Sequence, residues 1–460
     1  MAARLVSLTR QRTRRTIRRA PDARRRRVRT PQPDSRSRNT WQQQAEQFLV
    51  GGVNSPVRTF RPIDDDPLYI ASARGAQMTA TDGQSFIDFI MGWGTLILGH
   101  QAPAVVRAVE QAARNGLAFG LTTPNEIELA RLITTAVPSV EKVRLTVSGT
   151  EACMTAIRLC RAITKRSHVV LMEGGYHGHS DSLLAGITTG IPDPVTRHTI
   201  RVGWNDVAAV EQLFADAERP IACVMVEPVP ANMGVVPPHQ GYLAQLRELT
   251  RRHGALLVFD EVVTGFRVGP GGAQMLFNVQ PDLTVFGKII GGGLPIGAIG
   301  GPARLMDRLA PLGDVYHAGT FAGHPLTMAA GVATLRELAR RPPYQRLEML
   351  GHRLADGLGK AARSAGVPVT INRIGSLLTI FFTDPPVHNW TQAVTTHRSS
   401  FAQWAQVMRQ QGLLVPPAPL EAWFISTAHT PRHIDQTVRA AADAFAACAL
   451  TTQEIARGLK

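Results

Sequence analysis

The sequence has little cysteine and no apolar run long enough to cross a membrane. Its four cysteines show no metal-ligand spacing; they are Cys153, Cys160, Cys223 and Cys448. Few, scattered cysteines are typical of proteins from a reducing compartment, where thiols stay free. We therefore expect buried free thiols, a cytoplasmic location and no membrane contact.

Acidic residues are nearly absent, and aromatic residues fully absent, from the amino-terminal segment 1–34. This segment contains twelve Arg against Asp22 and Asp34, so it carries ten of the fifteen net positive charges of the chain. Such a composition predicts disorder, because it offers too little apolar surface to bury. The apolar core of a secretory signal is missing, which leaves an Arg-rich transit peptide, a nucleic-acid-binding arm or a solvated extension. We favour the extension and do not expect nucleic acid as a partner.

The chain as a whole has an ordinary globular composition. With 460 residues, 44% of them hydrophobic and 18% charged, it is long enough for two or more domains. We expect residues 35–100 to form the first part of a small domain, residues 101–341 to form a large domain, and residues 342–460 to complete the small one.

The predicted large domain alternates apolar strands with helical patterns. Strands are expected near residues 142–147, 168–172, 199–203, 221–227, 255–260 and 283–286. Alternation of this kind indicates a mostly parallel sheet with helices on both faces, which is an α/β fold. After residue 342, helical patterns and short strands predict a smaller α+β domain.

Two of these strands carry a charged residue at or just after the carboxyl end. The apolar run 255–259 ends in Asp260, and the run 283–286 is followed by Gly287 and Lys288. Short unbroken apolar runs are typical of strands buried on both faces. Open α/β sheets bind their ligands at the carboxyl ends of such strands. The acid and the amine therefore point to one cleft.

A buried Lys in this place suits one particular chemistry. Desolvation lowers the pKa of a Lys amine, and a partly deprotonated amine can form a Schiff base with a carbonyl. Pyridoxal phosphate needs such a Lys, together with a carboxylate that keeps its ring nitrogen protonated. The alternative is a structural ion pair between Asp260 and Lys288, which the two residues by themselves would favour. The flanking sequence favours the cofactor site instead.

The flanking motifs are DEVVTGFR and DLTVFGKIIGGGLPIGAIGG. They resemble the class III, fold-type I pyridoxal-phosphate aminotransferases, and among these most of all the glutamate-1-semialdehyde 2,1-aminomutases. The resemblance covers roughly residues 35–447. It implies a large domain with a mostly parallel sheet of the seven-stranded type, a smaller α+β domain, and pyridoxal 5′-phosphate as the cofactor.

The motif SGTEA follows the strand 142–147 and resembles the phosphate site of this family. Backbone N–H groups at the start of a helix bind phosphate, and Ser148 and Thr150 add hydroxyl groups. Gly149 lets the backbone approach closely. In isolation, Ser148 is explained equally well as an ordinary helix N-cap.

The resemblance also assigns contacts to the cofactor ring. Tyr176 and Val262 match the residues on its two faces, and Asn232 matches the partner of its phenolic oxygen. Asp260 matches the partner of the ring nitrogen, and Lys288 matches the Schiff-base lysine, the expected catalytic residue.

Gly319 and Thr320 match a loop that reaches the phosphate of the neighbouring subunit in this family, which implies a homodimer. His177 and His179 have the spacing of metal ligands, but no further carboxylate or Cys lies at ligand spacing nearby. We therefore expect polar pocket-lining histidines and no metal.

Four residues match substrate-side positions of the aminomutases; they are Ser55, Arg58, Trp93 and Glu421. Arg58 suits a carboxylate because a guanidinium group can donate two parallel hydrogen bonds. Without the resemblance, Arg58 is explained equally well as a surface arginine. A lone Glu421 is most often a solvated surface acid, and a core residue is the competing interpretation of Trp93.

Two departures from the aminomutases bear on function. The segment after Asp181 is shorter than their mobile lid, and His324 replaces their usual Asn. A short lid favours escape of an intermediate. We therefore expect an aminotransferase that moves an amino group from an amino-acid donor to an aldehyde or ketone acceptor, with the aminomutase as the alternative. A nucleic-acid-binding protein with an idle cofactor domain is a third hypothesis, which the presence of Asp260 and Lys288 disfavours.

Overall fold

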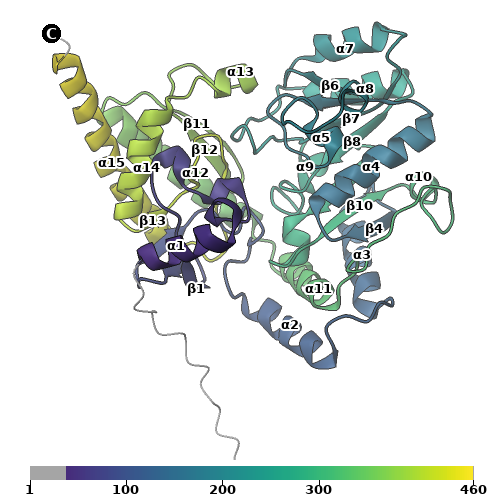
Figure 1. Cartoon of the computed structure of the whole chain (residues 1–460), viewed down its shortest axis with the longest axis horizontal. Coiled ribbons are helices and arrows are strands. Elements are labelled where there is room, and N and C mark those ends of the chain that lie inside the picture. Colours follow the sequence, from purple (N-terminus) through teal and green to yellow (C-terminus); the bar gives the residue numbers. More distant parts are fainter. Residues whose placement is uncertain (1–37, 459–460) are drawn as a thin grey trace, which may run out of the picture.

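The computed structural model of the protein describes residues 38–458, so the segment 1–34 predicted to be disordered lies outside the described residues. Its largest sheet has seven strands in the order β4-β10-β9-β8-β7-β5-β6 (Figure 1). In that order they are β4 (Lys142–Thr146), β10 (Gly297–Gly301), β9 (Leu283–Gly287), β8 (Leu256–Asp260), β7 (Ile221–Val226), β5 (His168–Met172) and β6 (Thr199–Val202). β10 runs opposite to the other six strands of this sheet. The predicted α/β fold with a mostly parallel seven-stranded sheet is confirmed.

Helices cover both faces of this sheet, and the alternation of side chains along β8 shows how. Leu257 and Phe259 pack in a core cluster with α8 (Tyr242–Arg252), whereas Val258 packs in a cluster with α4 (Gly149–Thr164). Successive side chains of a strand point to opposite faces. Asp260 therefore shares the face of Val258, toward α4.

Other helices complete this larger part of the molecule. They are α2 (Pro103–Asn115), α3 (Pro124–Ala136), α5 (Asp181–Leu184), α6 (Asp193–Thr196), α7 (Val207–Ala215), α9 (Gly272–Leu276), α10 (Ala303–Met306) and α11 (Pro325–Arg340). α3 begins with a capping box: the backbone N–H of Thr123 donates to Glu126 at 2.7 Å.

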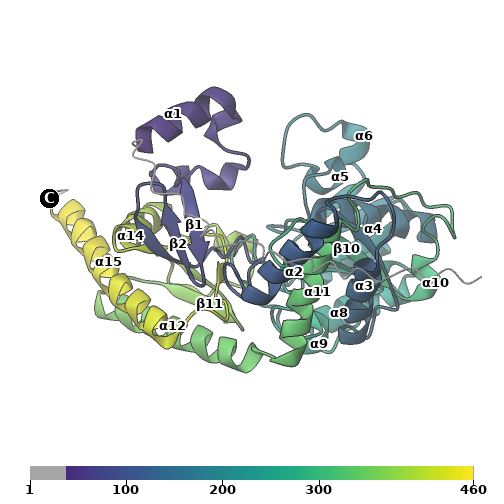
Figure 2. The ribbon, with the colours of Figure 1, turned by 90° about the horizontal axis from the view of Figure 1, so that it is seen from below.

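Two smaller sheets lie beside the large one (Figures 1 and 2). The first has the order β1-β2-β3-β13, and the second the order β11-β12-β14. Their strands are β1 (Ile70–Arg74), β2 (Gln77–Ala80), β3 (Ser85–Asp88), β11 (Thr370–Ile374), β12 (Leu377–Phe381), β13 (Leu413–Leu414) and β14 (Trp423–Phe424). β13 pairs with β3, which joins the beginning of the chain to its end. A small domain built from both ends requires this pairing; its exact boundaries stay predictions.

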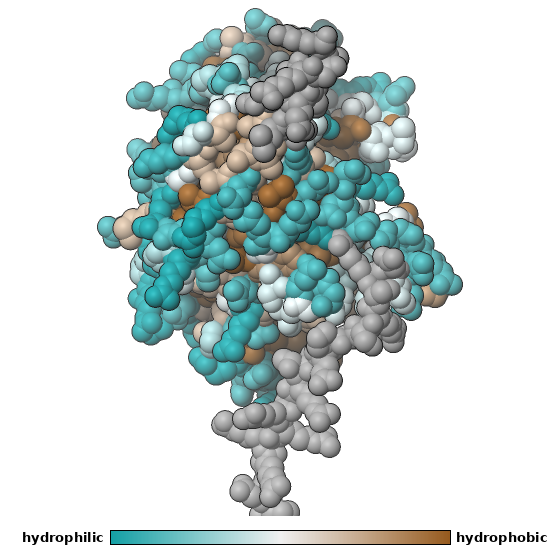
Figure 3. Space-filling model, turned by 90° about the vertical axis from the view of Figure 1, so that its left-hand side faces the viewer, coloured by the Kyte–Doolittle hydropathy of each residue, from teal (hydrophilic) through white to brown (hydrophobic). Residues whose placement is uncertain are grey.

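The helices that accompany the smaller sheets are α1 (Arg38–Phe48), α12 (Tyr344–Ser364), α13 (Trp390–Ala393), α14 (Arg398–Gln410) and α15 (Pro431–Gly458). Figure 3 shows that the outer face on this side is largely hydrophilic, with apolar side chains in scattered groups. Among the described residues, no helix has the length and apolar character needed to span a membrane.

Candidate functional site

Asp260 and Lys288 meet where β8 and β9 end. Asp260 is the last residue of β8, and Lys288 opens the short 3-10 helix η4 (Lys288–Gly291) directly after β9. Lys288 has φ 48°, in the left-handed region that non-glycine residues rarely adopt. Such strain is typical of functional sites, because it persists only where the surroundings enforce it.

A cavity of about 320 Å³ lies in front of these strand ends. It brings together eight of the predicted cofactor-site residues: Ser148, Gly149, Thr150, Tyr176, Asn232, Asp260, Val262 and Lys288. We call it the inner cavity.

The start of α4 forms the wall of the inner cavity suited to phosphate. Ser148 is the N-cap, as its alternative interpretation expected, and its Oγ accepts from the backbone N–H of Glu151 at 3.2 Å. A Cβ atom on Gly149 would lie 3.2 Å from Val262, and one on Gly178 would collide with Thr150. Small residues therefore keep open the space in front of the first helical N–H groups, as an anion site requires.

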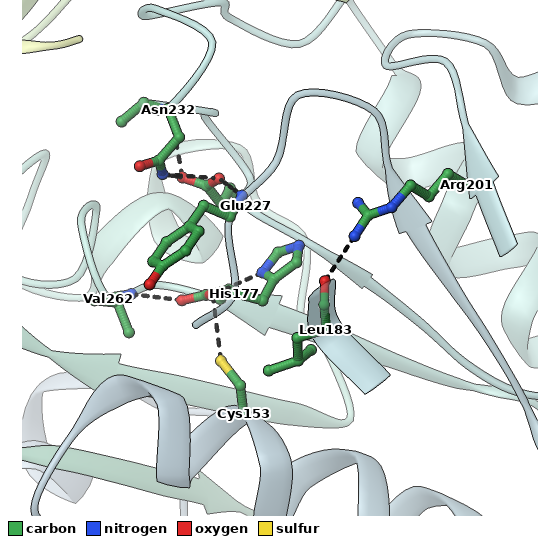
Figure 4. A network of polar contacts seen from close by, with 10 residues as sticks. Cys153, His177, Leu183, Arg201, Glu227, Asn232 and Val262 are labelled. Carbon is green, nitrogen blue, oxygen red and sulfur yellow. Dashed lines mark hydrogen bonds and ion pairs between the residues drawn. The ribbon is translucent and has the colours of Figure 1, made fainter. Parts of the chain in front are cut away.

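Asp260 is held by three donors (Figure 4). His177 Nδ1 lies 2.7 Å from its Oδ2, the thiol of Cys153 donates to the same oxygen at 3.4 Å, and the backbone N–H of Val262 donates to Oδ1 at 3.1 Å. Hydrogen bonds from fixed groups keep a buried carboxylate in one orientation. The predicted site did not include His177 or Cys153 in this role. The side chains of Cys153, His177 and Asp260 have potential metal-ligating atoms within 4.8 Å of one another. The hydrogen bonds between them already explain this proximity.

Glu227 positions two predicted residues. It follows β7 and accepts from the backbone N–H of Tyr176 at 2.9 Å and from Asn232 Nδ2 at 3.0 Å. Burial raises the pKa of Glu227, and Asp260 raises it further, while His177 opposes the shift. The sequence did signal this residue, because Glu227, like Asp260, is a carboxylate at the end of an apolar strand.

A second cavity, of about 860 Å³, adjoins the first, and we call it the outer cavity. All four predicted substrate-side residues line it: Ser55, Arg58, Trp93 and Glu421. The two cavities share Tyr176, Asn232 and Lys288. Lys288 therefore lies where the two cavities meet. Sequence reasoning missed four further residues of the outer wall: Glu173, Ile187, Arg201 and Trp390.

Arg267, from the DEVVTGFR motif, fixes the loop that carries Trp93. It is 1% exposed and donates to the carbonyl of Gly94 at 2.6 Å and to Ser376 Oγ at 3.2 Å. Its guanidinium carbon lies 5.1 Å from the ring centre of Phe424. Burial lowers the pKa of Arg267 to about 9. Trp93 itself has φ 57°, which is a strained conformation for this residue. Arg267 supports it by binding the carbonyl of the next residue, Gly94.

Burial and neighbouring charges act in opposite directions on the pKa values of Lys288 and Glu421. Burial lowers the pKa of the Lys288 amine, although nearby carboxylates, chiefly Asp260 and Glu227, oppose the shift. Burial also raises the pKa of Glu421 to about 7, against the opposing influence of Lys288. Perturbed groups that share a cavity are typical of sites for proton transfer.

Two predicted residues lie apart from these cavities. Gly319 and Thr320 are exposed in the single chain and line neither cavity. Their expected contact with the phosphate of a neighbouring subunit stays a prediction.

The sequence pattern that defines the class-III aminotransferases matches residues 61–440. The chain belongs to this family. The resemblance stated from the motifs is thereby confirmed.

Individual relatives of this class-III protein are similar over nearly their whole length. A glutamate-1-semialdehyde 2,1-aminomutase from Desulforudis audaxviator is 49% identical over 413 residues, which cover 87% of this chain and 96% of that protein. The protein of the same name from Aquifex aeolicus is 47% identical over 412 residues, with coverage of 87% and 97%.

Solved structures share the fold of this class-III protein. An omega-transaminase from Sphaerobacter thermophilus matches with a TM-score of 0.84 and 33% identity, covering 89% of this chain and 97% of that one. A glutamate-1-semialdehyde aminomutase from Pseudomonas aeruginosa matches with a TM-score of 0.81 and 26% identity, covering 89% and 94%. Another structure of the Pseudomonas enzyme, with a TM-score of 0.80, is a complex with PMP.

The prediction of an intermolecular aminotransferase was wrong, because the relatives at 49% and 47% identity are aminomutases. That prediction treated the length of one segment as the measure of enclosure. In the structure, residues from η2 (Pro56–Arg58), Trp93 and Trp390 also wall the outer cavity. His324, the second departure, is the N-cap of α11 and lines neither cavity.

Lys288→Ala should abolish covalent trapping of the cofactor by borohydride, because among the described residues no other Lys lines either cavity. Mass spectrometry of the reduced protein measures the adduct. Lys165→Ala, which changes a Lys at the far end of α4, is the matched control and should trap as the wild type does. An adduct on the Lys288→Ala protein would show that the assignment is wrong.

Glu421→Gln should stabilise the cofactor-free protein increasingly as the pH rises from about 5 to about 8. The folded carboxyl has a pKa of about 7 against an ordinary value of 4.5, so the folded state keeps a proton that the unfolded state releases within this window. The gain in unfolding free energy should approach about 3 kcal/mol above the window and nearly vanish below it. Urea unfolding measures it.

The matched control for this titration is Glu218→Gln, which changes an exposed carboxylate. It should show no such pH dependence. An equal gain for Glu421→Gln at both pH values would contradict the shift.

Proposed function

We propose that the protein is a glutamate-1-semialdehyde 2,1-aminomutase, which moves the amino group of its substrate from carbon 2 to carbon 1 and so forms 5-aminolevulinate. The observation that carries this proposal is the meeting of Ser55, Arg58, Trp93 and Glu421 around Lys288 in one cavity. Relatives of that name, similar over nearly their whole length, support it.

Pyridoxal phosphate is the cofactor of this class-III enzyme, and the inner cavity has the chemistry to hold it. The amides and hydroxyls at the start of α4 suit its phosphate, and the fixed carboxylate of Asp260 suits a protonated ring nitrogen. Tyr176 and Val262 provide two walls for a flat ring. When bound, the cofactor supplies an electron sink and a carrier for the amino group.

The protein's own residues then have distinct tasks. Arg58 binds the carboxylate of the substrate through its guanidinium group. The Lys288 amine, which burial makes easier to deprotonate, carries protons to and from the substrate carbon atoms. Asp260 stays fixed by His177 and so holds its charge at one point throughout.

The wild-type enzyme should convert glutamate-1-semialdehyde to 5-aminolevulinate without any added amino acid. Arg58→Ala should raise the KM for this substrate about 10- to 100-fold, because a charge-assisted hydrogen-bond pair is lost. Arg61→Ala changes an exposed arginine of the neighbouring helix η3 (Arg61–Ile63) and should leave KM unchanged. Dependence of turnover on an added donor amino acid would contradict the proposal.

We also propose that the enzyme is a cytoplasmic homodimer. Large apolar side chains around Gly319 and Thr320 are exposed in the single chain: Leu312 is 72%, Tyr316 72% and Phe321 55% exposed. Apolar surface of this kind beside a site is typical of a subunit interface.

Sedimentation velocity should therefore give a dimer at assay concentration. Phe321→Asp should shift it toward monomer, because a charge would enter the buried interface. Val394→Asp, on an exposed apolar residue far along the chain, is the control and should stay dimeric. A fully active wild-type monomer would overturn the proposal.

A further inference from the structure

The segment between β5 and β6 reaches the mouth of the outer cavity, although it is short. Ile187, near its middle, lines this cavity and is 58% exposed. Figure 2 shows that the part of the chain around α5 and α6 projects on the same side of the molecule as α1. η2, which follows α1, supplies Arg58 to the same cavity.

The base of this segment is fixed to β6. Arg201 Nη2 donates to the carbonyl of Leu183 at 2.6 Å (Figure 4). Its Nε donates to the carbonyl of Ala185 at 3.3 Å. Thr199 Oγ1 donates to the carbonyl of Ser182 at 2.8 Å. Leu183 and Ala185 are 2% and 4% exposed, so their side chains are anchored in the protein.

The tip of the segment is exposed throughout residues 186–190. Gly186 and Gly190 have φ 76° and 88°, and a Cβ atom at either would meet no atom within 4 Å. The backbone N–H of Ile187 donates to the carbonyl of Leu184 at 2.9 Å, which joins the tip to the fixed base. A fixed base with an exposed tip is the arrangement of a short lid.

Arg201 itself is part of the outer cavity wall. Within the described residues, its guanidinium group donates two hydrogen bonds, and both go to neutral carbonyl groups. Burial lowers the pKa of Arg201, and the charge of Glu173 opposes the shift. The guanidinium group of Arg201 is bonded to the base of the segment, and Arg201 also lines the outer cavity. This side chain therefore connects the segment to the cavity wall.

We propose that Arg201 is a positioning residue that fixes residues 182–185, so that Ile187 stays at the mouth of the outer cavity and the reaction intermediate is retained. The inference rests on the proposed aminomutase function. There the substrate aldehyde would exchange its oxygen for the amino group of the cofactor's amine form, which would thereby become the aldehyde form. The resulting diamine must stay bound until it gives its original amino group back to the cofactor. Each diamine that escapes carries away one amino group, so the enzyme loses one equivalent of its amine form.

The test compares Arg201→Gln, Arg201→Lys and Arg197→Gln in the holoenzyme. Arg197 is an exposed arginine at the end of the same segment. We expect Arg201→Gln to raise the diamine released per product formed about tenfold, since hydrogen bonds from a charged group are lost. Arg201→Lys should restore part of the retention, and Arg197→Gln should behave as the wild type.

A second measurement does not need turnover. Amide hydrogen exchange in the peptide spanning residues 182–191 should quicken about tenfold in Arg201→Gln and stay unchanged in Arg197→Gln. Ile187→Ala changes the exposed tip and should also release more diamine. It provides a second test if Arg201→Gln does not fold.

The outcomes separate the two proposals. A wild type that does not isomerise, together with faster exchange in Arg201→Gln, would refute the aminomutase function and keep the anchoring role. Unchanged exchange in Arg201→Gln, or a raised KM without added diamine release, would overturn the anchoring role. If Arg201→Gln does not fold, normal retention by Ile187→Ala would overturn the proposal that this segment retains the intermediate.

Discussion

Burial of charge at the carboxyl end of the central sheet is the constraint on which the site depends. An unpaired charge removed from water costs several kcal/mol, so each charged group there must be held by partners. Asp260 accepts from His177 and Cys153, and Glu227 accepts from Tyr176 and Asn232. These partners leave the carboxylates little freedom to turn, and their directions are fixed before any ligand arrives.

The walls of the outer cavity are fixed in a similar way, by hydrogen bonds from a buried charged group. Lys288 and Trp93 both adopt left-handed backbone conformations, and Arg267 ties the loop after Trp93 to the smaller sheets. Strained residues need rigid surroundings, which these cross-connections provide. Arg267 therefore connects the aromatic wall of the outer cavity to the smaller part of the molecule, whereas residues 186–190 are exposed.

The sequence predicted the centre of the site better than its rim. Asp260 and Lys288 lie at strand ends, so an apolar pattern was enough to bring them to one edge of the sheet. Ser55, Arg58, Trp93 and Glu421 are far apart in the sequence, and only resemblance to a family placed them together.

Arg201 and Arg267 could not be predicted in this way. Their partners are backbone carbonyls of other segments, and no residue pattern marks such contacts before the chain is folded. The error about the lid has the same origin. Segment length is visible in a sequence, whereas enclosure is a property of all the walls around a cavity.

A crystal structure of the holoenzyme tests the central claim most directly. We expect the cofactor in the inner cavity, with its phosphate at Ser148 to Thr150, its ring between Tyr176 and Val262, and its ring nitrogen within hydrogen-bonding distance of Asp260. A cofactor whose ring nitrogen faces away from Asp260, or a cofactor in its aldehyde form that is not joined to Lys288, would contradict the claim.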